Sequence, residues 1–363
     1  MKKINSFSFK NIKPPRNEVL NIQSSFKRFW NKFFSSKTAI ISLITLCLIV
    51  LSVIISLIFY QQSYNQAINN SYALNTELPS SLTGFKLLIL PESEELNVYR
   101  EFAKQYPKSV FIERIFDDSD GLITYLVKFN AYNLFNDNSL HLLGTNSQGI
   151  DNYARLIYSF ANLMLISTIS VLISIFLSIF IGGFVAIYFK KEIAKIYDKI
   201  FTTFALIPYL LFALILFLVL KNNLINSIII FSTISTIALS LNAYQKSVEI
   251  LRNEFINAEK AIGFTRWNLF SKTLIKPLIF NQPIQAIEQI VLIFISYSAI
   301  SIFDINKTVL TLGTIILEAL NLSDINPAYI IVTSLMTTFY VFSLKFIAFE
   351  LNSAYINQRS YYE

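Results

Sequence analysis

Residues 38–60 read TAIISLITLCLIVLSVIISLIFY, a stretch of 23 residues without a charged side chain. An α-helix needs about 20 mostly apolar residues to cross the hydrocarbon core of a bilayer. A long polar leader precedes this stretch, and no small-residue cleavage signature accompanies it. A signal peptide that is removed carries such a signature, so we expect an uncleaved membrane-spanning helix here.

Five more apolar stretches of suitable length follow. They cover residues 156–189, 200–220, 224–241, 285–303 and 328–344. The sequence therefore predicts an all-α polytopic membrane protein with six transmembrane helices. Pro208 predicts a kink in the third helix. Glu288 lies near the start of the fifth, where it is either a functional intramembrane carboxylate or a side chain that reaches water at the cytoplasmic end.

The composition excludes several classes of protein. Of the 363 residues, 54% are hydrophobic and 15% are charged, whereas about 25% are charged in a soluble domain. The single cysteine, Cys47, and the single histidine, His141, exclude an internal disulfide and a zinc site built from Cys and His. The chain has no phosphate-binding loop of the form G-x-x-x-x-G-K-[ST]. We therefore expect a non-catalytic chain that binds no cofactor or metal.

The distribution of charge predicts the topology. Residues 1–37 contain nine basic residues and one acidic residue, whereas residues 61–153 contain six basic and eleven acidic residues. Lys and Arg near membrane spans stay on the cytoplasmic side. The loops at 190–199 and 242–283 are net basic and the loop at 304–327 is net acidic, so the signs alternate along the chain. The N-terminus, both basic loops and the C-terminus are therefore predicted to be cytoplasmic.

This topology divides the chain into parts. They are a cytoplasmic leader (1–37), the first transmembrane helix (38–60), an extracellular insert (61–153), a core of five helices (154–350) with the large inner loop 242–283, and a cytoplasmic tail (351–363). The aromatic residues of the leader recur at helical spacing between lysines and an arginine over residues 26–34. This pattern predicts an amphipathic helix on anionic membrane lipid and argues against nucleic-acid binding. Strand-like stretches at 86–90 and 122–129 predict that the insert is folded.

The segment before the second helix reads HLLGTNSQGIDNYARLIY over residues 141–158. Its glycines, Gly144 and Gly149, permit tight turns. Asp151 precedes an apolar run and is a plausible helix N-cap. Arg155, one turn later, is placed to extend to the outer membrane interface. A capped return of the chain into the membrane explains these residues without substrate contact. The alternative is an extracellular gate, to which His141 and Thr145 would also belong.

The large inner loop contains EFINAEKAIG at residues 254–263. Leu251, Phe255, Ala258 and Ile262 recur at helical spacing and predict one apolar stripe. Gly263 stands where a left-handed C-cap would end the helix. A second short helix is expected at 266–274, where it would end before Pro277. Two short helices joined by a glycine would form a rigid projection.

Both segments resemble known motifs. Residues 141–158 resemble the H-x-x-G-T-D-x-x-G-R-D-x-x-S-R-L-I-Y signature of C-type permeases in oligopeptide and dipeptide ABC transporters, with Asn146, Ile150 and Ala154 in place of Asp, Arg and Ser. Residues 254–263 resemble the E-A-A-x-x-x-G motif with which ABC importer permeases dock onto their ATPases. There Asn257 and Glu259 replace Glu and the second Ala, and Pro277 falls one position late.

This resemblance covers residues 24–60 and 141–358. It implies a type I ABC importer permease in a bacterial plasma membrane, with a peptide as the substrate. The implied partners are a second homologous permease chain, two ATPase subunits that bind ATP and Mg, and an extracellular peptide-binding lipoprotein. The ATPase-docking residues would be Glu254, Phe255, Ala258, Glu259, Ile262 and Gly263. The alternative hypothesis is a non-transporting membrane sensor or scaffold whose insert binds a partner.

Overall fold

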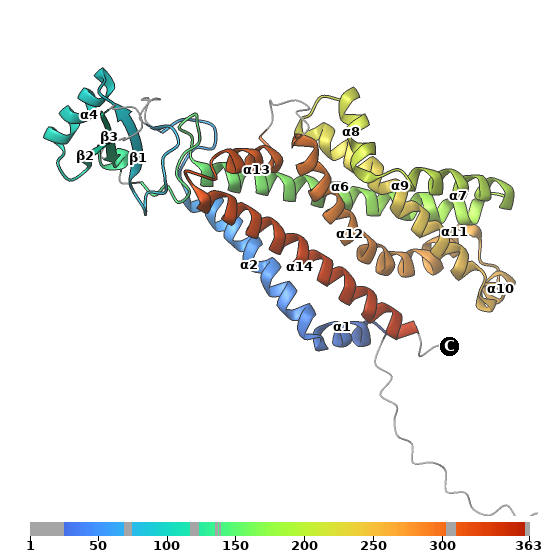
Figure 1. Cartoon of the computed structure of the whole chain (residues 1–363). Coiled ribbons are helices and arrows are strands. Elements are labelled where there is room, and N and C mark those ends of the chain that lie inside the picture. The colour runs from blue at the N-terminus through green and yellow to red at the C-terminus, as the bar shows by residue number, and fades with distance from the viewer. Residues whose placement is uncertain are drawn as a thin grey trace, which may run out of the picture.

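A computed structural model describes residues 25–68, 75–116, 123–134, 137, 139–302 and 310–359. The predicted leader up to residue 24 and the last four residues of the tail lie outside these ranges. The fold is mostly helical (Figure 1), and five helices are long and apolar enough to cross a membrane. They are α2 (Lys37–Phe59), α6 (Asn152–Tyr188), α9 (Leu224–Leu251), α12 (Ile275–Ile302) and α14 (Pro327–Arg359).

The third predicted span is not one helix. Helix α7 (Lys191–Ala205) and helix α8 (Tyr209–Val219) replace it, and their axes differ by 89°. Pro208 is the N-cap residue of α8, so the chain leaves the helix here instead of kinking within it. The predicted loop at 190–199 is likewise wrong, because these residues form the first turns of α7. This segment has the apolar periodicity of a helix, formed by Ile193, Ile196 and Ile200, which the prediction overlooked because the segment is rich in lysine.

Helices α6 and α9 form a close parallel pair. Small buried residues recur at every fourth position of α6, namely Ser170, Ser174, Ser178 and Gly182. The Ser174 hydroxyl donates to the backbone carbonyl of Ser232 at 2.9 Å. A Cβ atom added to Gly182 would lie 2.5 Å from the carbonyl oxygen of Ser240. Small side chains therefore let the two backbones approach closely, as is typical of helix pairs in membranes.

Because α6 and α9 run in the same direction, the helices α7 and α8 that connect them must bring the chain back across the membrane. Residue 174 lies beside residue 232, and residue 182 lies beside residue 240, so both helices run toward the same end of the molecule. The chain must therefore return to the other end between them, and only α7 and α8 lie between them in the sequence. Counted as one crossing, this pair gives the six crossings that the sequence predicts.

Helix α12 continues directly from the segment before it. The short helix α11 (Arg266–Asn268) leads into a π-helical turn, η1 (Leu269–Leu274), and then into α12. Pro277 was expected to end this helix, but it lies within the first turn of α12, and Pro283 lies farther along. A π-helical turn changes the local hydrogen-bond pattern and accommodates backbone groups that proline leaves unpaired. Figure 1 shows that α12 bends along its length.

Helix α1 (Ser25–Ser35) confirms the amphipathic helix predicted in the leader. Its Phe33 side chain is only 2% exposed and packs beside Ile347 and Leu351 of α14, so this helix also contacts protein and not only lipid. A second short helix, α13 (Leu312–Asn321), lies in the region predicted as the loop 304–327. Thr311 and Thr314 form a capping box at its start, a local signal that the prediction of a loop overlooked.

The insert contains a small α/β unit. Its antiparallel sheet has the order β1-β3-β2, with β1 at Lys86–Pro91, β2 at Val110–Phe116 and β3 at Ile123–Phe129. Helix α4 (Glu94–Gln105) joins β1 to β2, and the short helix α5 (Ala131–Leu134) follows β3. The prediction located two of these strands and missed β2 and α4. Figure 1 shows this unit at the opposite end of the molecule from helix α10 (Glu254–Ala261).

Candidate functional sites at the two ends of the helices

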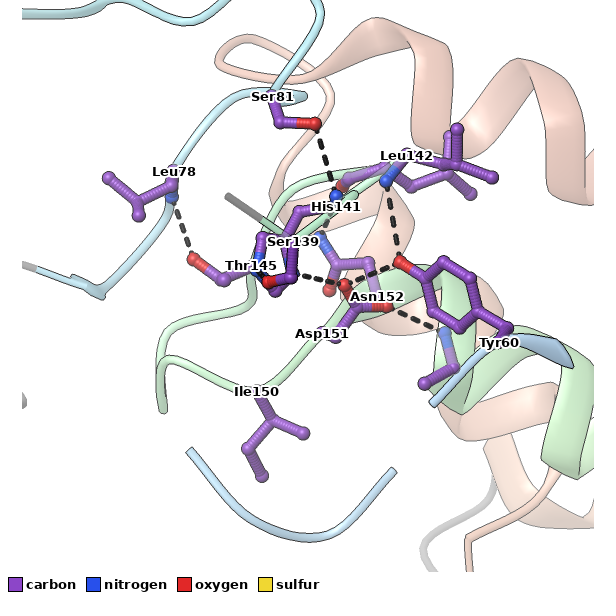
Figure 2. Close-up of polar contacts among 12 residues, drawn as sticks. Tyr60, Leu78, Ser81, Ser139, His141, Leu142, Thr145, Ile150, Asp151 and Asn152 are labelled. Carbon is purple, nitrogen blue, oxygen red and sulfur yellow. Dashed lines mark hydrogen bonds and ion pairs between the residues drawn. The ribbon is translucent and has the colours of Figure 1, made fainter. Parts of the chain in front are cut away.

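His141 lies in the last part of the insert, just before α6, and is the centre of a buried polar cluster (Figure 2). Its ring is fully buried. The Nδ1 atom lies 2.7 Å from Oδ2 of Asp151, and the Nε2 atom lies 3.2 Å from Oδ2 of Asp137. The Ser139 hydroxyl is 2.8 Å from Nε2, and the Tyr132 ring stacks on the imidazole. Two carboxylates on opposite sides of the ring favour its doubly protonated form.

The pKa of His141 follows from these contacts. Burial lowers the pKa of the imidazole, but hydrogen bonds and charge interactions with Asp151 and Asp137 outweigh burial and raise it. The pKa of Asp137 changes in the opposite direction. Burial raises it, whereas hydrogen bonds from Ser139 and His141 lower it, and the result is a lowered pKa. These contacts favour the protonated form of the His141 ring and the ionised form of the Asp137 carboxyl group.

Asp151 links three parts of the chain. Its Oδ1 atom accepts a hydrogen bond of 2.7 Å from the backbone N–H of Ala154, which confirms the predicted N-cap of α6. Its Oδ2 atom also accepts a hydrogen bond of 2.8 Å from the hydroxyl of Tyr60, the residue that ends α2. One carboxylate thus joins the end of α2, the start of α6 and the His141 loop.

The glycines of this segment form the tight turns that the sequence predicts. Gly144 and Gly149 have positive φ values of 64° and 74°. A Cβ atom on Gly144 would lie 2.0 Å from the carbonyl oxygen of Leu78, so no larger residue fits there. The Thr145 hydroxyl accepts a hydrogen bond of 2.9 Å from the N–H of Leu78 (Figure 2). It also donates to the carbonyl of Asn75. These contacts attach the segment 141–158 to residues 75–78, an earlier part of the insert.

Arg155, which is predicted to extend to the outer membrane interface, has a protein partner that the sequence did not reveal. Its side chain is 11% exposed and forms a two-point ion pair with Glu318 on α13. Its Nη1 atom also donates to the carbonyl of Tyr64. Glu318 was missed because 163 residues separate the two side chains and no local pattern connects them. The ion pair holds the first turn of α6 against α13.

At the opposite end, α10 is a short helix with a complete C-terminal cap. Gly263 has a φ of 94°, which confirms the predicted left-handed C-cap. The N–H of Gly263 donates to the carbonyl of Lys260 at 3.1 Å, and the N–H of Phe264 donates to the carbonyl of Glu259 at 3.0 Å. These two bonds form a Schellman motif, which ends the helix at a defined residue.

The side chains of α10 are mostly exposed. Ile256 is fully buried against α9 and α12, whereas Phe255 is 49% and Ile262 is 76% exposed. Ala258 is exposed too. The predicted stripe included Leu251, but the chain breaks between α9 and α10, so Leu251 belongs to a different helix. The loop predicted at 242–283 is therefore mostly helical.

Two acidic residues of the predicted docking set have different surroundings. Glu254 begins α10 and is exposed. Glu259 accepts a hydrogen bond of 2.8 Å from the hydroxyl of Thr273 in η1. This bond connects α10 to the helix that continues into α12, so the two helices form one projection.

Comparison with family models decides between the hypotheses. Residues 174–355, half of the chain, match the model of the binding-protein-dependent transport system inner membrane component. Residues 24–78 match the N-terminal transmembrane domain of oligopeptide transport permease C. The chain belongs to the binding-protein-dependent transport permeases. It is a C-type permease subunit of an ABC peptide importer. No curated protein matches the sequence.

The matched ranges separate the two sites of the permease. Helix α10 lies within the matched core, whereas the segment 141–158 and the sheet of the insert lie between the two matched ranges. The described residues contain no group of three His, Cys, Asp or Glu side chains that could hold a metal ion.

Glu288 occupies a different position in the permease from the one that the sequence predicts. The fifth helix starts well before residue 285, so Glu288 lies in the middle of α12 and not near its end. Its side chain is exposed. Carboxylates within a membrane span are costly and usually face a protein interior or a water-filled path.

Proposed function

We propose that this permease forms the translocation pathway for peptides together with a homologous permease chain, and that α10 docks it onto an ATPase subunit. The observation that supports docking most strongly is the exposure of Phe255, Ala258 and Ile262 on a capped helix at one end of the molecule. Exposed apolar side chains that gather on one short helix are typical of a protein interface.

The contacts of α10 suit it to transmit movement. Ile256 anchors its inner side, the Schellman motif fixes its end, and the Glu259–Thr273 hydrogen bond ties it to η1. When ATP closes the ATPase subunits, α10 moves with them, and the movement passes through η1 into α12. Backbone groups must stay paired inside the bilayer, so the helices move largely as rigid units and open the pathway alternately to each side.

ATP and Mg bind to the partner ATPase subunits in this proposal, and this chain is a non-catalytic subunit. Its sequence lacks the phosphate-binding loop that an ATP site of that type needs. The excess of basic residues before α2 supports a cytoplasmic N-terminus. The packing of α1 against the last turns of α14 supports a C-terminus on the same side.

The insert then faces the outside of the bacterial plasma membrane. An extracellular peptide-binding lipoprotein delivers the peptide from that side. The segment 141–158 acts as a rigid joint between the sheet of the insert and the membrane helices, because its polar side chains bond to one another, to backbone groups and to Glu318 of α13.

Co-purification in mild detergent, followed by mass spectrometry, tests this proposal. We expect two ATPase chains and a second six-span permease in equal amounts with this chain. The double substitution Phe255→Ser and Ile262→Ser should release the ATPases but retain the second permease. Recovery of this chain alone, with nucleotide and lipid present, would contradict the proposal.

A further inference from the structure

One side of α12 stays uncovered by the rest of the chain. It is a stripe at helical spacing, formed by Asn281, Gln285, Glu288, Leu292 and Ile295. Glu288, Leu292 and Ile295 are exposed, and the other two are half-buried. The residues on either side of the stripe are buried, among them Ile284, Val291, Leu278 and Ser296. Most other residues of the helix pack against α6, α9, α14 and the other core helices, while Ile279, Phe280 and Pro283 are exposed outside the stripe, nearer the start of the helix.

The chemistry of this stripe differs from the exposed faces of the other spans. Those faces are apolar, and their large exposed residues include Ile41, Leu48 and Ile58 of α2, Leu172 and Phe176 of α6, and Leu335, Phe342 and Phe346 of α14. Such faces suit contact with lipid chains. The α12 stripe instead begins with an amide, a second amide and a carboxylate, which are unfavourable in contact with lipid.

Packing against α2 places the carboxylate within the membrane. Ile284 and Ile287, which precede Glu288 in the sequence, pack in a cluster with Ala39, Leu43 and Leu46 of α2. Glu288 therefore lies deeper than Lys37, where α2 begins. The nearest basic residue toward the inner end of its own helix is Lys276, twelve positions away, or about 18 Å along the axis. Within the described residues, Glu288 has neither an ion pair nor a hydrogen bond.

We propose that this stripe lines the peptide pathway and that Glu288 binds the ammonium groups of the passing peptide. The inference rests on the proposed function, because a pathway requires the second permease chain. The cargo of a peptide importer supplies the complementary charge, since a peptide with a free N-terminus carries an α-ammonium group and lysine side chains carry another. Leu292 and Ile295 continue the stripe as an apolar surface for uncharged side chains.

Accessibility to water is the first test. Cys47→Ser removes the one native thiol, and Glu288→Cys then places a cysteine on the stripe. Leu335→Cys on the exposed apolar face of α14 is the matched control. In the assembled complex, a cationic, membrane-impermeant methanethiosulfonate reagent should modify residue 288, and transported peptide should slow the reaction. Residue 335 should stay unmodified. If the cysteine at position 288 does not react with the reagent either with or without ATP, it faces lipid or a partner side chain. This result overturns the inference.

The charge is the second test. Uptake is measured for three peptides that differ only in a central Lys, Gln or Glu, with the same binding protein throughout. Glu288→Gln should lower uptake by about fivefold, which corresponds to about 1 kcal/mol for a partly solvated charge pair. Glu288→Asp should restore uptake. Loss confined to the Lys peptide assigns the side-chain ammonium, and equal loss for all three peptides assigns the N-terminus.

The controls separate this inference from the proposed function. Glu192→Gln removes a charge from the exposed first turn of α7 and should leave uptake unchanged. Basal ATPase activity of the complex should not change in the Glu288→Gln variant. If that variant assembles and transports all three peptides at the wild-type rate, the inference alone is overturned. Failure of the wild-type chain to assemble with ATPases contradicts the proposed function instead.

Discussion

The two ends of the permease use their polar and apolar side chains in opposite ways. At the insert end, His141 and Asp151 are almost completely buried and bond to each other, and Asp151 also bonds to Tyr60. At the α10 end, Phe255 and Ile262 are largely exposed and pack against little of this chain. Both segments were recognised as motifs of one family. The structure indicates that the first motif holds the chain together, whereas the second leaves its side chains available to a partner.

Substitution of Asp151 should give the largest effect at the insert end. Asp151→Ala removes the N-cap of α6 and leaves a buried His141 without its closest carboxylate. Breaking a buried charge pair costs about 3–5 kcal/mol, so we expect a strongly lowered midpoint of thermal unfolding in detergent. Asp151→Asn retains a capping oxygen, so its unfolding midpoint should fall less than that of Asp151→Ala. An unchanged midpoint for Asp151→Ala would show that the cluster does not stabilise this end.

Gly263 allows a test of the other end. Gly263→Arg forces a side chain into a left-handed conformation that costs about 1–2 kcal/mol for a non-glycine residue, although open space surrounds the site. We expect insertion into the membrane to stay intact and ATPase association to weaken by about tenfold. Gly263→Asn is the control, because asparagine tolerates this conformation better. The measurement is the amount of ATPase that co-purifies with each variant, and equal amounts would argue against docking through α10.

A substitution at Ile262 tests the exposed face of α10 without straining the backbone. Ile262→Ser changes a side chain that is 76% exposed, so the unfolding free energy should stay within about 0.5 kcal/mol of the wild type. ATPase association should nevertheless weaken. Leu82 in the insert is equally exposed, and Leu82→Ser provides a matched control that should leave the association unchanged. Equal association for both variants would mean that the exposed face of α10 contacts no ATPase.

The smallest expected effect is the change in folding stability with pH that results from the titration of His141. The pKa of His141 is raised above its usual value of 6.5 in the folded chain. Its contribution to stability is therefore complete below 6.5 and is lost as the pH rises through the folded pKa, by at most about 1.4 kcal/mol per pH unit. As the pH rises above 6.5, the unfolding midpoint of the wild type should fall more than that of His141→Gln. Parallel pH profiles would show that the imidazole does not stay charged between its carboxylates.

Local signals predicted much of the molecule. The thickness of the hydrocarbon core requires a long apolar run for each span, so the runs at 38–60, 156–189 and 224–241 located α2, α6 and α9. Helix ends are also local, because the capping groups lie within a few residues of the end. The roles of Asp151 and Gly263 as caps could therefore be predicted from the sequence.

Contacts between distant segments could not be predicted in this way. The Arg155–Glu318 ion pair and the hydrogen bond from Tyr60 to Asp151 leave no periodic pattern in the sequence. The sequence determined by itself that the chain crosses a membrane, roughly where its long apolar helices lie and which residues cap α6 and α10, because these properties depend on neighbouring residues. Only the tertiary structure decided which motif side chains are bonded inside the chain and which remain exposed, because that depends on which distant segments pack against them.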